Sequence, residues 1–330
     1  GSRRVLPGLA LSGSAALATF ALVLGATVDR GLEDGARVTV GADARVDFTS
    51  DAAPGTTGEA ARIAALPGVT SVVVGQVIDG ARIVADGKVT PALLVIMDRP
   101  SPVLARGALQ PGMEIDIPQD GAPGIRVVPT GEAPAISGSA DVLVVGRESG
   151  VPIVPDTIWV DGPGAADAVA GLPAVLRSEV LETRRSAPLV SGLLAMTWTA
   201  AAFLLVTGLL GFILAAAAGA PQRWQTLSRL RTLGLTPRDA RRVASGSLLP
   251  LALLTAVGGP LLGVAVVLLV AGPLGLSLLT GQIDTPALVL PWPWLALVVA
   301  AFPLLVTVVV RAESAVRRRL RLADVLRVGG

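Results

Sequence analysis

The sequence predicts an α-helical membrane protein with four transmembrane helices and a large extracytoplasmic α+β domain inserted between the first and the second. Three observations lead to this fold class. Of the 330 residues, 52% are hydrophobic and only 16% are charged, whereas about a quarter of the residues in a soluble chain are charged. Four long apolar stretches interrupt the charges, and the polar segments between them differ strongly in the sign of their charge.

Each apolar stretch can be compared with the ~20 residues that a helix needs to cross the hydrocarbon layer. The stretches run over Leu6–Val28, Ala187–Gln222, Val243–Ile283 and Thr285–Val310. Prolines and glycines interrupt the third, so its spanning part is expected at Leu248–Val270. A cleaved signal peptide is the competing interpretation of the first stretch, although a signal peptide has an apolar core of only about 7–15 residues.

The charges of the polar segments predict the orientation. The segment Arg223–Arg242 has six Arg and one Asp, and the tail from Arg311 has six Arg and two acidic residues. The segment Asp29–Arg185 instead has 13 basic and 21 acidic residues. Because Arg and Lys accumulate on the cytoplasmic side, both termini are expected inside and residues 29–187 outside the inner membrane of a bacterial cell.

The outer segment reads as a folded domain on a stalk. Arg30 and Asp34 are spaced i,i+4, which favours a solvated continuation of the first helix. Arg177–Arg185 is a second charged, helix-compatible segment that leads into the second span, and Pro188 is expected to bend it. Strands are predicted at Val38–Phe48, Val69–Ile78, Val89–Met97, Ile125–Val128, Asp141–Val145 and Thr157–Val160, and helices at Gly58–Leu66 and Ala165–Ala170.

These patterns divide the chain into eight parts. They are the N-terminus with the first span and stalk (1–37), the α+β domain (38–175), stalk and second span (176–219), a cytoplasmic coupling segment (220–243), the third span (244–273), an outer loop (274–288), the fourth span (289–310) and an amphipathic tail (311–330). In the third span, the Gly259-x-x-x-Gly263 spacing either permits close helix packing or arises by chance at this glycine content.

Composition excludes several functions. The chain has no Cys, His or Tyr, so disulfides, Cys/His zinc sites, thiol nucleophiles and Ser/His/Asp triads are ruled out. A net charge of +2 and 3% aromatic residues argue against a nucleic-acid partner. No catalytic residue, cofactor or metal site is predicted.

The cytoplasmic loop carries an amphipathic pattern. Gln222–Leu233 has leucines at roughly helical spacing, Gly234 breaks the pattern, and Thr236-Pro237 has the signature of a new helix start. Two interpretations remain open: the helix docks on a protein partner, or the arginines contact anionic lipid head groups. The tail has the same ambiguity, with an apolar stripe at Val316, Leu320, Ala323 and Leu326.

Five segments resemble one family. The sequence LSRLRTLGLTPRDARR at Leu227–Arg242 is similar to the FtsX-like permeases of ABC transporters, of the MacB and LolCDE type, and the resemblance extends over essentially the whole chain. The other matching segments are Asp29–Ala36, Val40–Asp43, Ile63–Val69 and Ala323–Gly329. The chain departs from the family at Thr226 and Ser247, where relatives often carry an acidic residue. Because many family members contain two permease modules, two interpretations stay open: the chain is a permease subunit, or it is the C-terminal module of a longer permease.

The resemblance implies a permease subunit, or half of one, that transmits ATP-driven motion for export or for lipid or lipoprotein handling. Its implied partners are an ABC ATPase subunit, a second permease module in a homodimer or heterodimer, and membrane lipids. The implied ATPase-coupling residues are Leu227, Leu230, Arg231, Leu233, Gly234, Leu235, Arg238 and Arg241. The only lysine is Lys88, in the outer domain, so there is no phosphate-binding loop and ATP hydrolysis is expected in the partner.

Two further functions stay open. Relatives in cell division use the same motion to activate a cell-wall hydrolase outside the membrane, and this is the first alternative. A membrane-anchored receptor is the second, although a receptor would not need a coupling segment.

The charge asymmetry makes a testable prediction about orientation. Because the chain has no native cysteine, single cysteines report cleanly. Ser71→Cys should react with an impermeant maleimide in whole cells, and Ser228→Cys only after the membrane is permeabilised. Labelling of the Ser228 position from outside would reverse the orientation.

Overall fold

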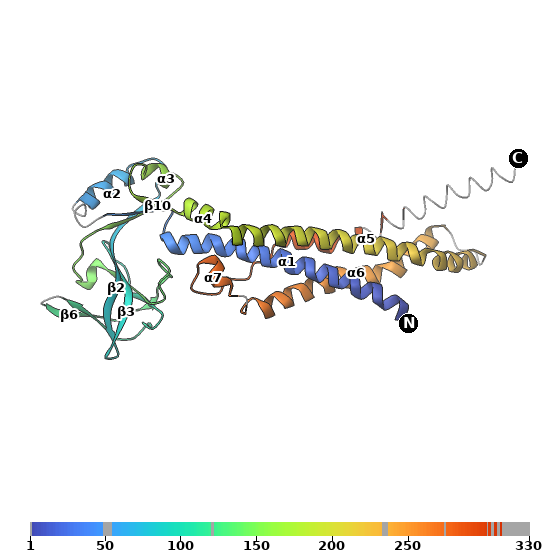
Figure 1. Cartoon of the computed structure of the whole chain (residues 1–330), viewed down its shortest axis with the longest axis horizontal. Coiled ribbons are helices and arrows are strands. Elements are labelled where there is room, and N and C mark those ends of the chain that lie inside the picture. Colours follow the sequence, from blue (N-terminus) through green and yellow to red (C-terminus); the bar gives the residue numbers. More distant parts are fainter. Residues whose placement is uncertain are drawn as a thin grey trace. The chain divides into compact units, whose positions relative to one another are not determined.

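A computed structural model describes residues 2–48, 55–119, 122–232, 237–273, 275–301, 303–304, 307–308 and 311. The chain divides into two compact units, which are described separately. The helical unit comprises Gly1–Asp29, Ser191–Leu274 and Ala287–Gly330, and the sheet unit comprises Arg30–Val190 and Gly275–Pro286. Figure 1 shows the elements of both units, coloured along the sequence.

The helical unit is built from α1 (Ser2–Val40), α5 (Pro188–Thr232) and α6 (Pro237–Val270), which run side by side in Figure 1. Among the described residues, three helices are long and apolar enough to cross a membrane, over Ser12–Val40, Pro188–Ala215 and Leu253–Val270. A shorter apolar helix covers Trp292–Ala301. Three of the four predicted spans are therefore seen as long apolar helices, and the fourth stays a prediction.

Two clusters of buried apolar side chains lie in the helical unit, and the larger consists mainly of alanines around Phe212. Ala15 and Leu22 of α1 pack in one buried cluster with Phe212 of α5 and Ala256 of α6. The shorter helix joins the unit through an edge-to-face contact of Trp294 with Trp198, at 5.5 Å between ring centroids. Outward leucines of α5 and α6 remain exposed, which leaves an apolar surface of the kind that a membrane or another apolar surface covers.

Two glycines of α6 lie against α1. A Cβ atom added at Gly259 would come within 2.5 Å of the Ala15 Cβ, and one added at Gly263 within 2.5 Å of the Ala16 carbonyl oxygen. Neither distance leaves room for a side chain, so the two helix backbones approach each other closely. The Gly259-x-x-x-Gly263 spacing therefore serves helix packing.

A mixed sheet of ten strands forms the centre of the sheet unit, within the described residues. The main path runs β10-β1-β9-β2-β3-β8-β4-β7, and β5 pairs with β2 and β6. The β3–β8 and β4–β7 pairs are parallel and the others antiparallel. The strands are β1 (Ala44–Asp47), β2 (Ser71–Ala85), β3 (Lys88–Met97), β4 (Leu104–Arg106), β5 (Ile115–Gln119), β6 (Ala122–Val127), β7 (Gly131–Glu132), β8 (Val142–Gly146), β9 (Thr157–Asp161) and β10 (Ala174–Leu176).

Both faces of the central strands are buried. Along β3, Leu94 and Ile96 face one core cluster while Leu93 and Val95 face another, as the two-residue period of a strand requires. A third cluster lies under α2 (Thr56–Ala64) and α3 (Ala165–Ala168). The remaining helices of the unit are α4 (Arg177–Ser186) and α7 (Leu276–Thr280), with a 3-10 turn at Arg147–Ser149.

The structure corrects the first predicted strand. The sequence alternates from Val38 to Phe48, but α1 continues to Val40 and β1 begins only at Ala44. Gly41, with a φ of +86°, ends the helix in the left-handed conformation that glycine adopts without strain. The predicted helix at Gly58–Leu66 is confirmed as α2.

The expected bend at Pro188 is a break between two helices. α4 ends at Ser186 and α5 begins at Pro188, and Ala187 between them has a ψ of 129°. Proline is tolerated in the first turn of a helix, where its missing N–H has no partner to lose.

The close approach of α6 to α1 predicts that Gly259→Leu destabilises the helical unit. Overpacking typically costs about 1–3 kcal/mol, so the variant should unfold at a lower temperature in detergent. Gly258→Leu is the matched control, because nothing lies within 4 Å of a Cβ atom added there. Equal melting temperatures for the two variants would contradict the contact.

Candidate functional site

The predicted coupling residues fall on the ends of two long helices. Leu227, Leu230 and Arg231 belong to α5, which continues without interruption to Thr232. Arg238 and Arg241 belong to the first turns of α6. Leu233, Gly234 and Leu235 lie outside the described residues.

The prediction of a separate short helix at Gln222–Leu233 is therefore wrong. Residues 222–232 are the last turns of α5. Four consecutive alanines at 215–218 are strong helix formers, and they carry the helix past Gly219 and Pro221. The consequence is that the coupling residues of α5 and its apolar window Pro188–Ala215 share one hydrogen-bonded helix.

In the sheet unit, α1, α4 and α7 meet at one half-buried arginine, Arg184. Arg184 of α4 donates from Nη2 to Thr39 Oγ1 of α1 at 2.8 Å and from Nη1 to the Thr280 carbonyl oxygen of α7 at 3.1 Å. The Thr39 hydroxyl in turn donates to the Gly35 carbonyl oxygen at 2.9 Å. We call this contact of Gly31, Gly35, Thr39, Arg184 and Thr280 the stalk junction.

Glycines make the stalk junction possible. A Cβ atom at Gly35 would overlap the Thr280 carbonyl oxygen, and one at Gly31 would come within 2.5 Å of the Thr280 Cγ2. Gly281, with a φ of +66°, ends α7 and faces Arg184, whose Cζ would lie 2.8 Å from an added Cβ atom. A side chain at Gly35 would meet the backbone of α7 and displace it from the stalk, whereas at Gly31 and Gly281 the nearest atoms belong to side chains.

Burial lowers the pKa of the Arg184 guanidinium from its ordinary value. Arginine nevertheless stays protonated in proteins, so the stalk junction contains a permanent, partly desolvated positive charge. Beside it, Arg185 pairs with Glu33 of α1, with 3.2 Å between Nη2 and Oε1. Two successive arginines of α4 thus bind α1.

The loop that contains α7 also contacts the sheet. Asp284 forms an ion pair with Arg106 of β4, and the Arg106 side chain is only 15% exposed. Glu132 lies near the same guanidinium, at 3.5 Å. The segment Gly275–Pro286, which we call the α7 segment, is therefore held at one end by the stalk and at the other by the sheet.

Sequence reasoning missed this arrangement, because residues 274–288 were expected to be an outer loop. Two signals were available: Gly275 and Gly281 bracket a five-residue helix, and Asp284 is the only charge between Arg242 and Arg311. Neither signal identifies a partner for the loop. Arg184 and Arg106 lie far from it in the sequence.

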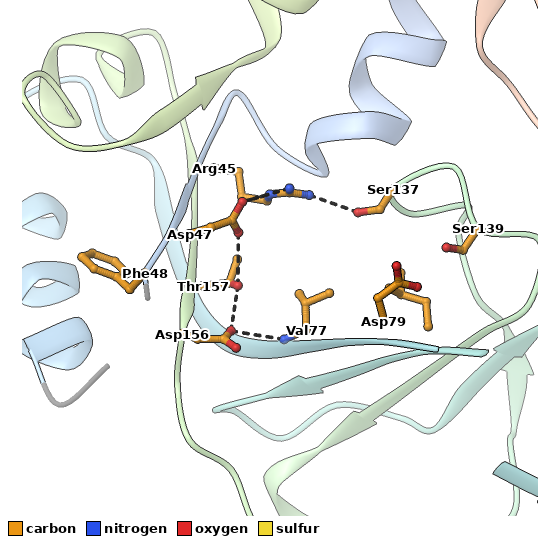
Figure 2. A pocket seen from close by; sticks show the side chains of 10 residues that line it. Arg45, Asp47, Phe48, Val77, Asp79, Ser137, Ser139, Asp156 and Thr157 are labelled. Atoms are coloured by element: carbon orange, nitrogen blue, oxygen red, sulfur yellow. Dashed lines mark hydrogen bonds and ion pairs between the residues drawn. The ribbon is translucent and has the colours of Figure 1, made fainter. Parts of the chain in front are cut away.

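A pocket of about 320 Å³ opens on the sheet unit, next to the end of α1. Figure 2 shows its lining, with Phe48 on one side and Ser139 on the other. Arg45 contacts Asp47 at 2.9 Å and donates to Ser137 Oγ at 3.0 Å. The complete lining is Arg45, Asp47, Phe48, Val77, Asp79, Leu93, Ser137, Ser139, Asp156 and Thr157.

Carboxylates outnumber basic groups in the pocket. Thr157 Oγ1 lies 2.8 Å from Asp156 Oδ1 and 3.3 Å from Asp47 Oδ1, so its single proton is shared between two acceptors. The Val77 N–H donates to Asp156 as well, at 3.2 Å. Over the described residues, no three acidic side chains are grouped so as to hold a metal ion.

Burial raises the pKa of the Asp156 carboxyl, and the charge of Asp47 adds to the shift, while hydrogen bonds from Thr157 and Val77 oppose it. The folded protein therefore binds this proton more tightly than the unfolded chain does. The stability that Asp156 contributes is present at low pH and is lost as pH rises through its folded pKa.

Asp156→Asn removes this titration and keeps an oxygen that can accept both hydrogen bonds. The stability of the sheet unit relative to the parent protein should increase between pH 4 and pH 7, as calorimetry of the full chain in detergent would measure. Asp79→Asn, which removes an exposed carboxylate of the same pocket, is the control. Parallel stability curves for parent and Asp156→Asn would contradict the prediction.

Comparison with known proteins gives a family match for part of the chain. Residues 198–319 match the family model described as FtsX-like permease C-terminal. No curated protein matches. A crystal structure of the periplasmic region of MacB from Actinobacillus actinomycetemcomitans is similar at 9% identity, covering 46% of this chain and 96% of that chain with a TM-score of 0.31. This score is too low to establish a common fold. The family model matches residues 198–319, and within that segment it bears out the FtsX-like resemblance that the sequence predicted.

Proposed function

We propose that this protein is the permease subunit, or half of the permease, of an ABC transporter, and that it transmits ATP-driven motion from the cytoplasm to the outer sheet unit. The family match supports the proposal, because residues 198–319 include the predicted coupling segment, most of α5 and all of α6. The transported material is proposed to be exported, or to be a lipid or lipoprotein.

The continuity of α5 is the observation that carries the proposal. One helix of 45 residues contains both the coupling residues at 227–231 and the apolar window Pro188–Ala215. At a rise of 1.5 Å per residue, such a helix is about 65–70 Å long, roughly twice the hydrocarbon thickness of a membrane. A displacement of Leu230 is therefore carried along a hydrogen-bonded rod to Pro188.

The partners follow from the composition and from the family. The chain lacks a phosphate-binding loop, so ATP hydrolysis is assigned to a separate ABC ATPase subunit. A second permease module, identical or related, is proposed to complete the transporter. The basic residues of the coupling segment favour a cytoplasmic location for the ATPase and an extracytoplasmic one for the sheet unit.

Leu230→Asp tests the coupling. If Leu230 packs against the ATPase, a carboxylate there is desolvated, which typically costs several kcal/mol at a packed contact. The variant should insert into the membrane at normal levels but lose at least tenfold in permease-dependent ATP hydrolysis by the ATPase that co-purifies with the parent protein.

The matched control is Ser228→Asp, which adds the same charge two residues away, on the other side of a helix by helical spacing. Equal hydrolysis by Leu230→Asp and the parent would overturn the coupling assignment and favour the contact of this segment with lipid. If no ATPase accompanies the parent protein, the membrane-anchored receptor becomes the better account.

A further inference from the structure

We propose that the α7 segment is a fixed part of the stalk and forms a second mechanical connection from the membrane helices to the sheet unit, with Arg184 and Asp284 as positioning residues. The inference deepens the proposed function and rests on it for the origin of the motion. The attachment of the α7 segment to the stalk and to the sheet is argued from the contacts of that segment alone.

The chain itself ties the α7 segment to the membrane helices. Residues 271–274 join it to the end of α6 at Val270, and residues 287–291 join it to the helix that begins at Trp292. An extended chain spans at most about 3.6 Å per residue, so neither linker exceeds roughly 20 Å. Because the linkers are short, a displacement of α6 or of the Trp292–Ala301 helix is expected to pull on the α7 segment.

The inner side of α7 is built for permanent contact. Leu276 and Thr280, one helical turn apart, are both buried. The Thr280 hydroxyl donates within α7, to the Leu276 carbonyl oxygen at 3.0 Å. Thr280 is the last residue of α7, where carbonyl groups have no intrahelical donor, and its carbonyl oxygen accepts from Arg184. Gly31 and Gly35 supply a flat surface on α1, into which the Thr280 methyl and carbonyl groups fit.

Arg184 fixes this contact in a way that no other cation can reproduce. Its guanidinium holds several donors in one rigid plane, and two of them reach α1 and α7 at the same time. Lysine would offer a single flexible ammonium group in place of this fork. Removing the guanidinium leaves the Thr280 carbonyl oxygen without the donor that ties α7 to α4.

Asp284 fixes the other end. It is the only charge in the chain between Arg242 and Arg311, and it pairs with Arg106 of β4, whose side chain is largely buried. An exposed ion pair contributes little, but the Arg106 side chain is only 15% exposed, and without Asp284 its guanidinium keeps only the longer contact with Glu132 at 3.5 Å. The α7 segment therefore touches the sheet as well as the stalk.

Hydrogen exchange of the full chain in lipid nanodiscs tests the attachment without any ATPase. The N–H groups of Leu278 and Gln282 are hydrogen-bonded inside the α7 segment, so their exchange reports its local opening. Arg184→Met and Gly35→Ala should each speed exchange of residues 276–282 at least tenfold. Unchanged exchange in both variants would overturn the proposal.

Two controls separate this effect from general destabilisation. Gly13→Ala makes the same change in α1 at a site where nothing lies within 4 Å of the added carbon atom, and Arg126→Gln removes an exposed ion pair with Glu114 elsewhere in the sheet unit. Neither should alter exchange at 276–282.

A double-mutant cycle tests the pair of Asp284 and Arg106. Asp284→Asn and Arg106→Gln should each speed exchange of the α7 segment about three- to tenfold, and the double variant should be no faster than the faster single variant, because the two residues act through each other. Multiplicative effects would remove Asp284 from the proposal.

An engineered disulfide between α1 and α7 tests whether the α7 segment stays in place during the ATPase cycle. The Cβ atom of a residue at Gly31 would lie 3.2 Å from the Thr280 Cβ, near the ~3.8 Å of a disulfide. Since the chain has no other cysteine, Gly31→Cys/Thr280→Cys should cross-link under mild oxidation. The oxidised and reduced forms should support equal ATP hydrolysis by the co-purified ATPase.

The outcomes are distinguishable. Activity that is lost on oxidation and restored by reduction means that α7 leaves the stalk during the cycle, which overturns the fixed attachment. Absence of permease-dependent hydrolysis even in the reduced form contradicts the proposed function, and hydrogen exchange then decides the attachment by itself.

Discussion

Close approach of backbone to backbone along α1 is the contact on which both units depend. In the helical unit, Gly259 and Gly263 of α6 leave no space between their backbone and residues 15–19 of α1. In the sheet unit, α1 itself supplies the glycines, and Gly31 and Gly35 receive Thr280 of α7. Between apolar helices in a membrane there is no hydrophobic driving force, because lipid tails are as apolar as leucine, so packing at small residues must hold them together.

The ion pairs and charged hydrogen bonds of the chain differ in how much they are expected to stabilise it. The exposed pairs Arg30–Glu33 and Arg126–Glu114 contribute little, since water and salt screen them. The arginines that contact the α7 segment are instead half-buried. Arg184 and Arg106 each connect the α7 segment to a different element, and each would be costly to leave unpaired in its partly desolvated site.

Periodicity and composition made much of the fold predictable. The apolar stretches became α1, α5 and α6 because length and hydropathy alone identify a membrane-spanning helix, and the β-branched run of Val142–Gly146 became a strand buried on both faces. The errors arose where two local signals competed. At Val38–Val40 the alternating pattern predicted a strand, but these residues continue the long helix α1. Gly219 and Pro221 predicted the end of a helix, but α5 continues through them after a run of alanines.

The stalk junction was beyond sequence reasoning for a different reason. Thr280 and Arg184 are 96 residues apart, and no local pattern around either residue specifies the other. The coupling residues were predicted from the family resemblance, and the structure places five of the predicted residues on α5 and α6. Short polar loops between apolar helices carry few local signals, so their contacts emerge only from the folded arrangement.

The single non-helical residue Ala187 gives the two long helices different mechanical characters. α1 runs unbroken from Ser2 to Val40, whereas the hydrogen-bond ladder between α4 and α5 is interrupted at Ala187. A continuous helix resists bending and twisting alike. An interrupted one passes on a push along its axis but little torque, so α1 corresponds to a rod and α4 with α5 to a jointed arm.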